Sequence, residues 1–343
     1  MHDHEQKEAM GMRFTALVTA ALVAGAASLA GTASAAEAVS VRLKWVAQAQ
    51  FAGFYVAKEK GFYAAEGLDV TVNPGGPNLN GETLVASGAD QFALAGGIEN
   101  LLASRGKGLP IVGIAMMLQR TPSAYVAFND SGIRSPKDFK GKKVSTFFTG
   151  AHNTLYAVLS KFDVGAADVT VVPQAVSMAP FIDRQIDVAT VMLFNELNVL
   201  KTRGVKDFTV FRAEDYGVSF PSDTVIVNEK LIAERPQTVQ AFLNGSMRGW
   251  KYAAEHQEEA VDIVLKAASG LDRAHQLAML AEYSKLMVAD LGTEKGIGVL
   301  DMTKLGAVRQ SLVDRKVLDA GVQVGSALAP RFWDAVPTQY KKP

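Results

Sequence analysis

Hydrophobic and polar residues follow two patterns that alternate along this chain. The stretch VSVRLKW over 39–45 has a period of two, typical of a half-buried strand, whereas residues 52–65 carry apolar side chains three and four apart, as a helix does. LDVTV, QFALA and LPIVGIAMML are further strand patterns, and they are separated by the helix patterns NGETLVASG and IENLLASRGKG. Repeated strand–helix units of this length predict an α/β fold whose sheet is mostly parallel and covered on both faces.

A polar, turn-rich stretch, NDSGIRSPKDFKGKKV, interrupts this rhythm near Asn129. A second alternating series follows, from the strand pattern KKVSTFF to the strand pattern FTVFR, and the chain is mainly helical after DTVIVN. This order is explained if the chain crosses into a second lobe and later returns. We therefore predict two α/β lobes with a hinge and an interlobe cleft, the first lobe comprising 36–128 plus 224–343 and the second 129–223.

The N-terminal segment predicts export. Arg13 precedes the apolar run FTALVTAALVAGAASLAG, and Ala33 and Ala35 are small residues of the kind that signal peptidase accepts. We expect residues 1–35 to be a signal peptide that is removed, with the mature chain starting near Ala36. The alternative is a membrane anchor, but this run is rich in Ala and Gly, is only weakly hydrophobic and has no basic stop signal after it.

Composition and charge narrow the function classes. The chain has 343 residues, of which 48% are hydrophobic, enough for two globular domains. Lys plus Arg (35) equals Asp plus Glu (35), so no excess positive charge is available to hold nucleic acid or an anionic membrane. There is no cysteine, which excludes disulfides, thiolate catalysis and cysteine metal sites. We expect a monomer that diffuses freely in a periplasm, without membrane insertion or a lipid anchor.

Groups suited to catalysis or metal binding are few. Of the five histidines, His2 and His4 lie in the expected signal peptide, and we single out His152; from residue 36 onward the sequence contains no closely spaced histidine pair, no serine elbow and no phosphate-binding loop. We therefore expect no metal site, no cofactor and no enzymatic activity. An exported enzyme that uses His152 with a nearby carboxylate stays open as the alternative from a different class.

Polar and aromatic residues follow the predicted strands at their carboxyl ends, where ligands bind in open α/β sheets. The candidates in the first lobe are Trp45, Gln48, Gln50, Gly75, Gly96 and Gly97. The candidates in the second lobe come from TGAHNT and LFNEL and are Thr149, Gly150, His152, Asn153, Asn195 and Glu196. Loops at these positions are also rich in Gly and Asn for structural reasons alone, so the pattern by itself leaves both interpretations open.

Four segments carry a resemblance to a known family: FAGFYVAKEKGFYAAEGLDV, LAGG, GIRSPKDFKGKKV and FNE at 194–196. Together they resemble the NMT1/THI5-like, or SsuA-like, substrate-binding proteins of importers for thiamine pyrimidines and sulfonates. The resemblance spans essentially the whole mature chain. It implies a type II periplasmic-binding-protein fold, two lobes that close on a small molecule, and delivery to an ABC permease powered by a separate ATPase.

The resemblance also suggests the ligand. In the family most aromatics of the first helix are core, which places Phe54, Phe62 and Tyr63 inside, while the aromatic at the position of Trp45 stands at the cleft and can stack on a flat ring. The FNE element resembles that of pyrimidine-binding members, where a carboxylate accepts from an aminopyrimidine and repels a sulfonate. We therefore expect a thiamine pyrimidine precursor of the hydroxymethylpyrimidine type, bound by Asn195 and Glu196.

Several alternatives remain at this point. Within the binding class, the ligand could be riboflavin, or a sulfonate such as taurine, or nitrate. Glu196 has an alternative role as a carboxylate that stabilises a helix N-terminus through the helix dipole. The family also contains a branch of pyrimidine-synthesising enzymes, but that branch carries a cysteine-rich motif, and this chain has no cysteine.

Overall fold

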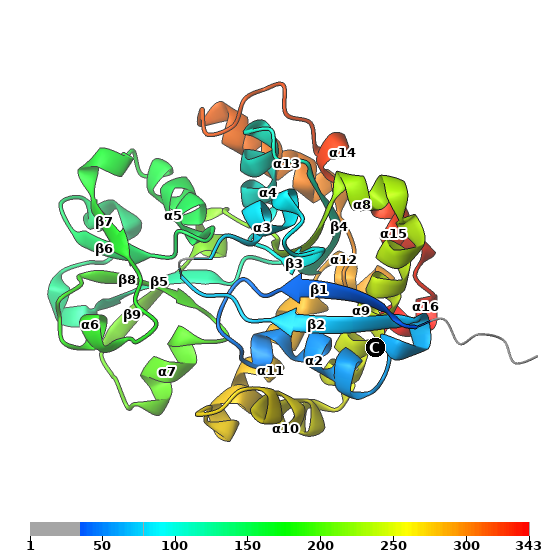
Figure 1. Cartoon of the computed structure of the whole chain (residues 1–343). Helices are drawn as coiled ribbons and strands as arrows, with labels where there is room; N and C mark the ends of the chain where they lie inside the picture. Colours follow the sequence, from blue (N-terminus) through cyan, green and yellow to red (C-terminus); the bar gives the residue numbers. More distant parts are fainter. Residues whose placement is uncertain (1–34, 78, 343) are drawn as a thin grey trace, which may run out of the picture. The chain divides into compact units, whose positions relative to one another are not determined.

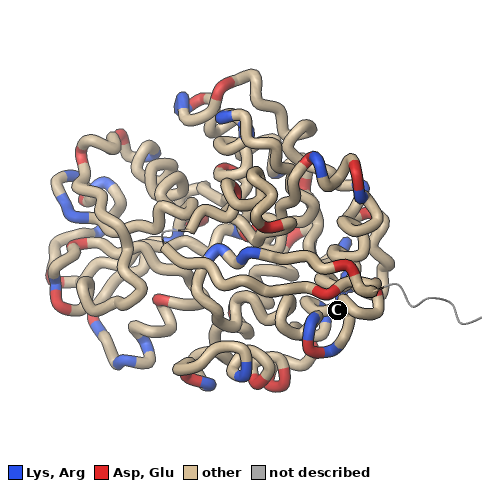
Figure 2. Tube along the Cα trace, viewed as in Figure 1, with Lys and Arg blue, Asp and Glu red and all other residues tan. Residues whose placement is uncertain are grey.

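The computed structural model describes residues 35–77 and 79–342, and the chain from Glu37 onward forms one unit built on two five-stranded sheets (Figure 1). The expected signal peptide over 1–35 falls almost wholly outside the described residues, so it stays a prediction. Within the described part of the chain, every helix is too short or too polar to cross a bilayer. Basic and acidic residues are interspersed along the trace (Figure 2), in keeping with the balanced charge of the sequence.

The first sheet has the strand order β2-β1-β3-β10-β4. Strand β1 pairs in parallel with β2 and β3, whereas β10 lies antiparallel between β3 and β4. A strand from late in the chain is therefore central in a sheet built mainly from its first third. The bounds are β1 (Glu37–Arg42), β2 (Leu68–Asn73), β3 (Phe92–Leu94), β4 (Ile111–Leu118) and β10 (Ser222–Asn228).

The second sheet repeats this arrangement with the order β7-β6-β8-β5-β9. Strand β6 is parallel to β7 and β8, and β5 lies antiparallel between β8 and β9. Each sheet is mostly parallel, as predicted, but mixed, because the one strand that enters from the other lobe, β10 in the first sheet and β5 in the second, runs antiparallel to the other four. The bounds are β5 (Ser123–Phe128), β6 (Lys143–Thr146), β7 (Thr170–Pro173), β8 (Val188–Met192) and β9 (Phe208–Arg212).

The chain passes between the sheets earlier than we expected. Strand β4 ends at Leu118 in the first sheet, and β5, which begins at Ser123, already belongs to the second sheet, ahead of the expected crossing near Asn129. The reason is that β5 continues the apolar pattern of β4 after a short break, whereas the polar stretch at Asn129 is a turn inside the second lobe. The return comes at β10, close to the expected position.

Helices cover both sheets (Figure 1). In the first lobe they are α2 (Ala52–Glu59), α3 (Gly81–Ser87), α4 (Ile98–Gly106), α8 (Glu229–Glu234), α9 (Pro236–Glu255), α10 (Gln257–Ala267), α11 (Arg273–Met287), α12 (Leu291–Lys295), α13 (Met302–Asp314), α14 (Val324–Ala327), α15 (Pro330–Ala335) and α16 (Thr338–Lys341). In the second lobe they are α5 (Ala151–Ser160), α6 (Ala179–Ile182) and α7 (Glu196–Thr202).

Helices α2 and α9 pack closely because glycines face each other. A Cβ atom on Gly249 would lie 2.1 Å from the carbonyl oxygen of Gly53, and a Cβ on Gly53 would lie 2.2 Å from the ring of Trp250. Phe54 is fully buried here, with its ring centroid 5.7 Å from that of Trp250 and 6.2 Å from that of Phe242. This confirms that Phe54 is core; Tyr63 is buried as well, whereas Phe62 is only partly buried against the core.

Candidate ligand-binding site

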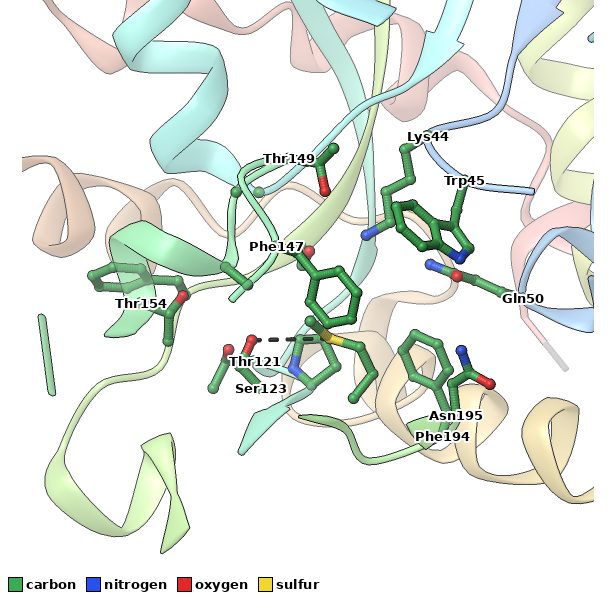
Figure 3. A pocket seen from close by; sticks show the side chains of 18 of the residues that line it. Lys44, Trp45, Gln50, Thr121, Ser123, Phe147, Thr149, Thr154, Phe194 and Asn195 are labelled. Carbon is green, nitrogen blue, oxygen red and sulfur yellow. Dashed lines mark hydrogen bonds between the residues drawn. The ribbon is translucent and has the colours of Figure 1, made fainter. Parts of the chain in front are cut away.

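A cavity lies between the two sheets, with about 600 Å³ of space that is not filled by atoms and that is partly open to solvent (Figure 3). Loops at the carboxyl ends of β1, β3, β6 and β8 contribute to its walls, together with the two segments that cross between the lobes. The first lobe supplies Lys44, Trp45, Gln48, Gln50, Gly96, Gly97 and Glu99; the second supplies Phe147, Thr149, Gly150, Ala151, Thr154, Met192, Phe194, Asn195 and Glu196; the crossings supply Thr121, Pro122, Ser123, Phe220 and Ser222.

The structure brings most of the predicted site residues to this cavity. Those in the lining are Trp45, Gln48, Gln50, Gly96, Gly97, Thr149, Gly150, Asn195 and Glu196. Gly75, His152 and Asn153 are not in the lining, although all three lie in loops or helix ends beside it. The strand-end pattern therefore led to residues that line this cavity, but it did not separate them from residues that hold the loops in place.

Gly75 supports Trp45 from behind. Its amide donates to the carbonyl oxygen of Trp45 at 2.9 Å, and a Cβ at this position would lie 2.0 Å from the carbonyl oxygen of Leu43. Only a residue without a side chain allows the loops after β1 and β2 to approach this closely. Gly75 thus fixes the position of the tryptophan loop without contacting the cavity.

His152 and Asn153 lie in the first turn of α5. The imidazole of His152 packs against Phe148 and Tyr156, with ring centroids 5.4 Å and 6.3 Å away. Burial lowers the pKa of His152, and its Nδ1 has no hydrogen-bond partner among the described residues. Asn153 donates through Nδ2 to Oδ1 of Asn100 on α4 at 3.1 Å, which links the two lobes.

Trp45 and Phe147 form an aromatic corner of the cavity. The two rings meet edge to face, with centroids 5.5 Å apart and planes at 87°. Trp45 is 8% exposed although it borders the cavity, because Phe147 and its own loop cover much of the indole. Figure 3 shows Trp45 beside Lys44 and Gln50, with Phe147 and Phe194 near them. This arrangement offers a flat ligand apolar surface from both lobes.

Glu196 begins α7 and is buried. Its Oε2 accepts from the amide of Met192 at 2.9 Å, and its Oε1 accepts from Nδ2 of Asn195 at 2.7 Å. Burial nevertheless raises the pKa of Glu196 to about 7, because desolvation outweighs the stabilising hydrogen bonds. Asn195 Oδ1 lies 3.0 Å from Nε2 of His275 on α11, so this part of the cavity wall also connects the lobes.

A polar network at the cavity was missed by the sequence analysis. The carboxylate of Asp223, on β10, is fully buried and pairs with the ammonium of Lys44. Its Oδ2 accepts from Nε2 of Gln50 at 2.9 Å and from the hydroxyl of Tyr283 at 2.9 Å. Gln48 in turn donates to Gln50 at 2.9 Å. The network holds both glutamines in position, and its members are far apart in the sequence.

Asp223 does carry a local signal. Its φ is 60°, a left-handed backbone conformation that is uncommon in a strand and is found most often where function or packing requires it. A single carboxylate at the start of the apolar strand DTVIVN is the corresponding sequence feature. Glu99 comes shortly after Gly96 and Gly97, at the end of the third strand pattern where the sequence places polar groups of the cleft, and it is buried at the cavity wall.

Comparisons with known proteins agree with the geometry. The family model described as NMT1/THI5 like matches residues 48–260. The chain is 28% identical to the riboflavin-binding protein RibY of Chloroflexus aurantiacus, over 86% of this chain and 85% of that protein. It is 30% identical to the formylaminopyrimidine-binding protein of Halalkalibacterium halodurans, over 67% of this chain and 71% of that protein.

Other relatives are named as enzymes, and solved structures show the same fold. The 4-amino-5-hydroxymethyl-2-methylpyrimidine phosphate synthase of Legionella pneumophila is 26% identical over 67% of this chain and 73% of that protein. The alkanesulfonate-binding protein SsuA of Xanthomonas axonopodis superposes with a TM-score of 0.66 at 17% identity, covering 85% of this chain and 98% of that one. This likeness confirms the predicted fold, which has two α/β lobes of the periplasmic-binding type.

Proposed function

The chain belongs to the NMT1/THI5-like family, and from this premise we propose that it is the substrate-binding protein of an ABC importer for a small planar heteroaromatic molecule. The preferred ligand is a thiamine pyrimidine precursor of the hydroxymethylpyrimidine type. The observation that carries the proposal is an interlobe cavity that combines the aromatic corner of Trp45 and Phe147 with the half-buried amide of Asn195 and the buried carboxyl group of Glu196. Those are the groups that a flat, amine-bearing ring requires.

The charges at the cavity favour a neutral or cationic ligand. Among the described residues that line it, Lys44 is the one basic side chain, and Lys44 is already paired with Asp223. Glu99 and Glu196 are both buried, and neither forms an ion pair with a basic side chain in the described part of the chain. A sulfonate or nitrate offers only acceptors, so it would leave the acceptor oxygens of these carboxyl groups unpaired, and the ionised fraction of Glu196 would repel it. This argues against the anionic alternatives.

Riboflavin is the second candidate, and one observation favours it. The relative named for riboflavin aligns over more of this chain than the relative named for formylaminopyrimidine does. An isoalloxazine ring would use the same aromatic corner and would fill more of the cavity. The two candidates differ in size, so direct competition between them separates the possibilities.

The proposal includes delivery to a permease and no chemical turnover. A receptor of this kind is exported to the periplasm, acts as a monomer and passes its ligand to a membrane permease that a separate ATPase drives. The enzyme alternative requires a reactive group at the ligand. His152, the side chain on which that alternative rested, lies outside the cavity lining. Relatives named as synthases keep the alternative testable.

Calorimetric titration of the purified mature protein with four probes tests the proposal. We expect hydroxymethylpyrimidine or formylaminopyrimidine to bind with a stoichiometry near one, riboflavin to compete or to bind more weakly, and taurine not to bind. Mass spectrometry of the mixture after incubation should recover the probe unchanged. Binding of taurine alone would contradict the ligand class, and conversion of a probe that is abolished by His152→Ala would contradict the receptor role.

A further inference from the structure

Glu99 occupies the point where loops of the two lobes meet at the cavity. It is the second residue of α4 and directly follows the Gly96–Gly97 loop, which lines the cavity together with Gly150 of the second lobe. A Cβ on Gly97 would lie 2.2 Å from Oε2 of Glu99, and a Cβ on Gly150 would lie 3.4 Å from its Oε1. The carboxyl group is therefore folded back over Gly97 and lies beside the opposite lobe.

This carboxyl group has an unused hydrogen-bonding atom. Glu99 is 5% exposed, and its Oε2 has no hydrogen-bond partner among the described residues. Glu196 and Asp223, the other carboxyl groups at this site, are both hydrogen-bonded to the protein. A buried polar atom without a partner is destabilising, and native proteins rarely retain one unless it serves a purpose.

The surroundings keep this carboxyl group protonated. Burial is the main reason that the pKa of Glu99 rises to about 8; the charges of Glu82 on α3 and Asp223 on β10 act in the same direction, while Lys44 opposes them. Lys44 does not neutralise Glu99, because its ammonium is paired with Asp223. At neutral pH Glu99 therefore presents one O–H donor and one carbonyl acceptor, side by side.

We propose that Glu99 contacts the ligand directly as a neutral acid, and that it recognises a ring edge on which a hydrogen-bond acceptor stands next to an N–H donor. An aminopyrimidine has such an edge, and so has a cyclic imide such as that of a flavin. A sulfonate has acceptors only and cannot complete the pair. The inference rests on the proposed function and adds to it the residue that reads the ligand's hydrogen-bonding pattern.

Two substitutions at Glu99 separate the contribution of the size and hydrogen bonds of the side chain from that of its protonation state. Glu99→Gln keeps the size of the side chain and its donor–acceptor pair but cannot ionise, whereas Glu99→Leu removes both hydrogen bonds. The probes are formylaminopyrimidine and riboflavin, titrated calorimetrically against the mature protein at pH 7 and pH 9. Thermal unfolding of each variant without ligand checks that it is folded.

We expect Glu99→Gln to bind within about threefold of the wild type at pH 7, and Glu99→Leu to bind at least about tenfold more weakly. From pH 7 to pH 9 the wild type should lose about tenfold in affinity, because the acid must ionise, while Glu99→Gln should lose much less. Comparing the wild type with Glu99→Gln at each pH removes the effect of ionisation of the probe and of Glu196, because both proteins share these groups. This comparison does not use Glu99→Leu, so it does not depend on the stability of that variant.

The failures of the two proposals are distinguishable. If the wild type binds neither probe, the proposed function is contradicted, and this inference with it. If the wild type binds but Glu99→Leu retains full affinity, or if Glu99→Gln shows the same pH dependence as the wild type, the inference alone is contradicted.

Discussion

Trp45 and Phe147 meet edge to face across the cavity, one from the loop after β1 and the other from the loop after β6, at a centroid distance of 5.5 Å. The contact joins the two lobes at the place where a flat ligand would lie. A ligand ring that inserts there replaces part of the contact between Trp45 and Phe147 with contacts between these side chains and the faces of the ligand. Opening of the cleft and ligand capture are therefore coupled at these two side chains.

The first prediction concerns Trp45. We expect Trp45→Ala to weaken binding of a heteroaromatic probe at least about tenfold, since stacking on an indole and the apolar area it buries are lost. The free energy of unfolding should change less than for a fully enclosed tryptophan, because the indole, although it is part of the buried core, also borders the cavity. Calorimetric titration measures the affinity, and urea denaturation measures the stability.

Trp250 provides the matched control for that experiment. It is the same residue type, but it is fully buried between α2 and α9. Trp250→Ala should lower the free energy of unfolding by about 3–5 kcal/mol. If Trp45→Ala instead lost as much stability as Trp250→Ala while retaining ligand affinity, the indole at position 45 would be a core residue only.

The second prediction concerns Glu196. Glu196→Gln should weaken binding of an amine-bearing pyrimidine by about tenfold, because a charge-assisted acceptor is replaced by a neutral amide. The carboxylate accepts one hydrogen bond from Met192 and one from Asn195, and the amide oxygen of glutamine can keep one of the two. The substitution should therefore lower the stability only modestly. An unchanged affinity combined with a lower melting temperature would assign Glu196 to the start of α7 alone.

The third prediction is a pH dependence of stability. Burial raises the pKa of Glu99 to about 8 and that of Glu196 to about 7, both above the ordinary value of 4.5. In the unfolded chain these groups ionise near their ordinary pKa, so between about pH 5 and pH 8 the folded state binds more protons. The free energy of unfolding should therefore fall as pH rises through this window.

Denaturation of the wild type and Glu99→Gln at pH 5.5 and pH 8 measures that effect. The substitution removes one of the two titrating groups. The free energy of unfolding of the variant should therefore fall less between pH 5.5 and pH 8 than that of the wild type. Equal pH dependence in the two proteins would mean that Glu99 is ionised in the folded state throughout this range.

The fourth prediction concerns the bonds between the lobes. Asn100 donates to the carbonyl oxygen of Thr149 at 2.7 Å and accepts from Asn153 at 3.1 Å. Asn100→Ala removes both bonds, so the ligand-free protein should be more open. Small-angle scattering should show a larger radius of gyration, and stopped-flow measurements should show faster ligand release.

Asn228→Ala is the control, because Asn228 also makes two bonds to carbonyl oxygens, at 3.0 Å and 2.9 Å, but both lie inside the first lobe. It should lower stability without changing the radius of gyration. The same radius for all three proteins would show that the Asn100 bonds do not hold the lobes together.

The sequence allowed much of the fold and part of the site to be predicted, for identifiable reasons. Periodicity located the strands, and loops at strand ends led to Trp45 and Glu196, because parallel strands bring those ends together. Periodicity could not assign β5 to its sheet, since pairing with β8 and β9 depends on contacts far along the chain. The pairing of Lys44 with Asp223 and the position of Glu99 beside Gly150 could not be predicted for the same reason.

A crystal structure of the mature protein with formylaminopyrimidine or riboflavin bound tests the central claim most directly. The account predicts the ring against the indole of Trp45 inside the interlobe cavity, with its polar edge within hydrogen-bonding distance of Glu99 or Glu196. A ring bound outside that cavity, or one in it that touches neither the indole nor either carboxyl group, would contradict the account.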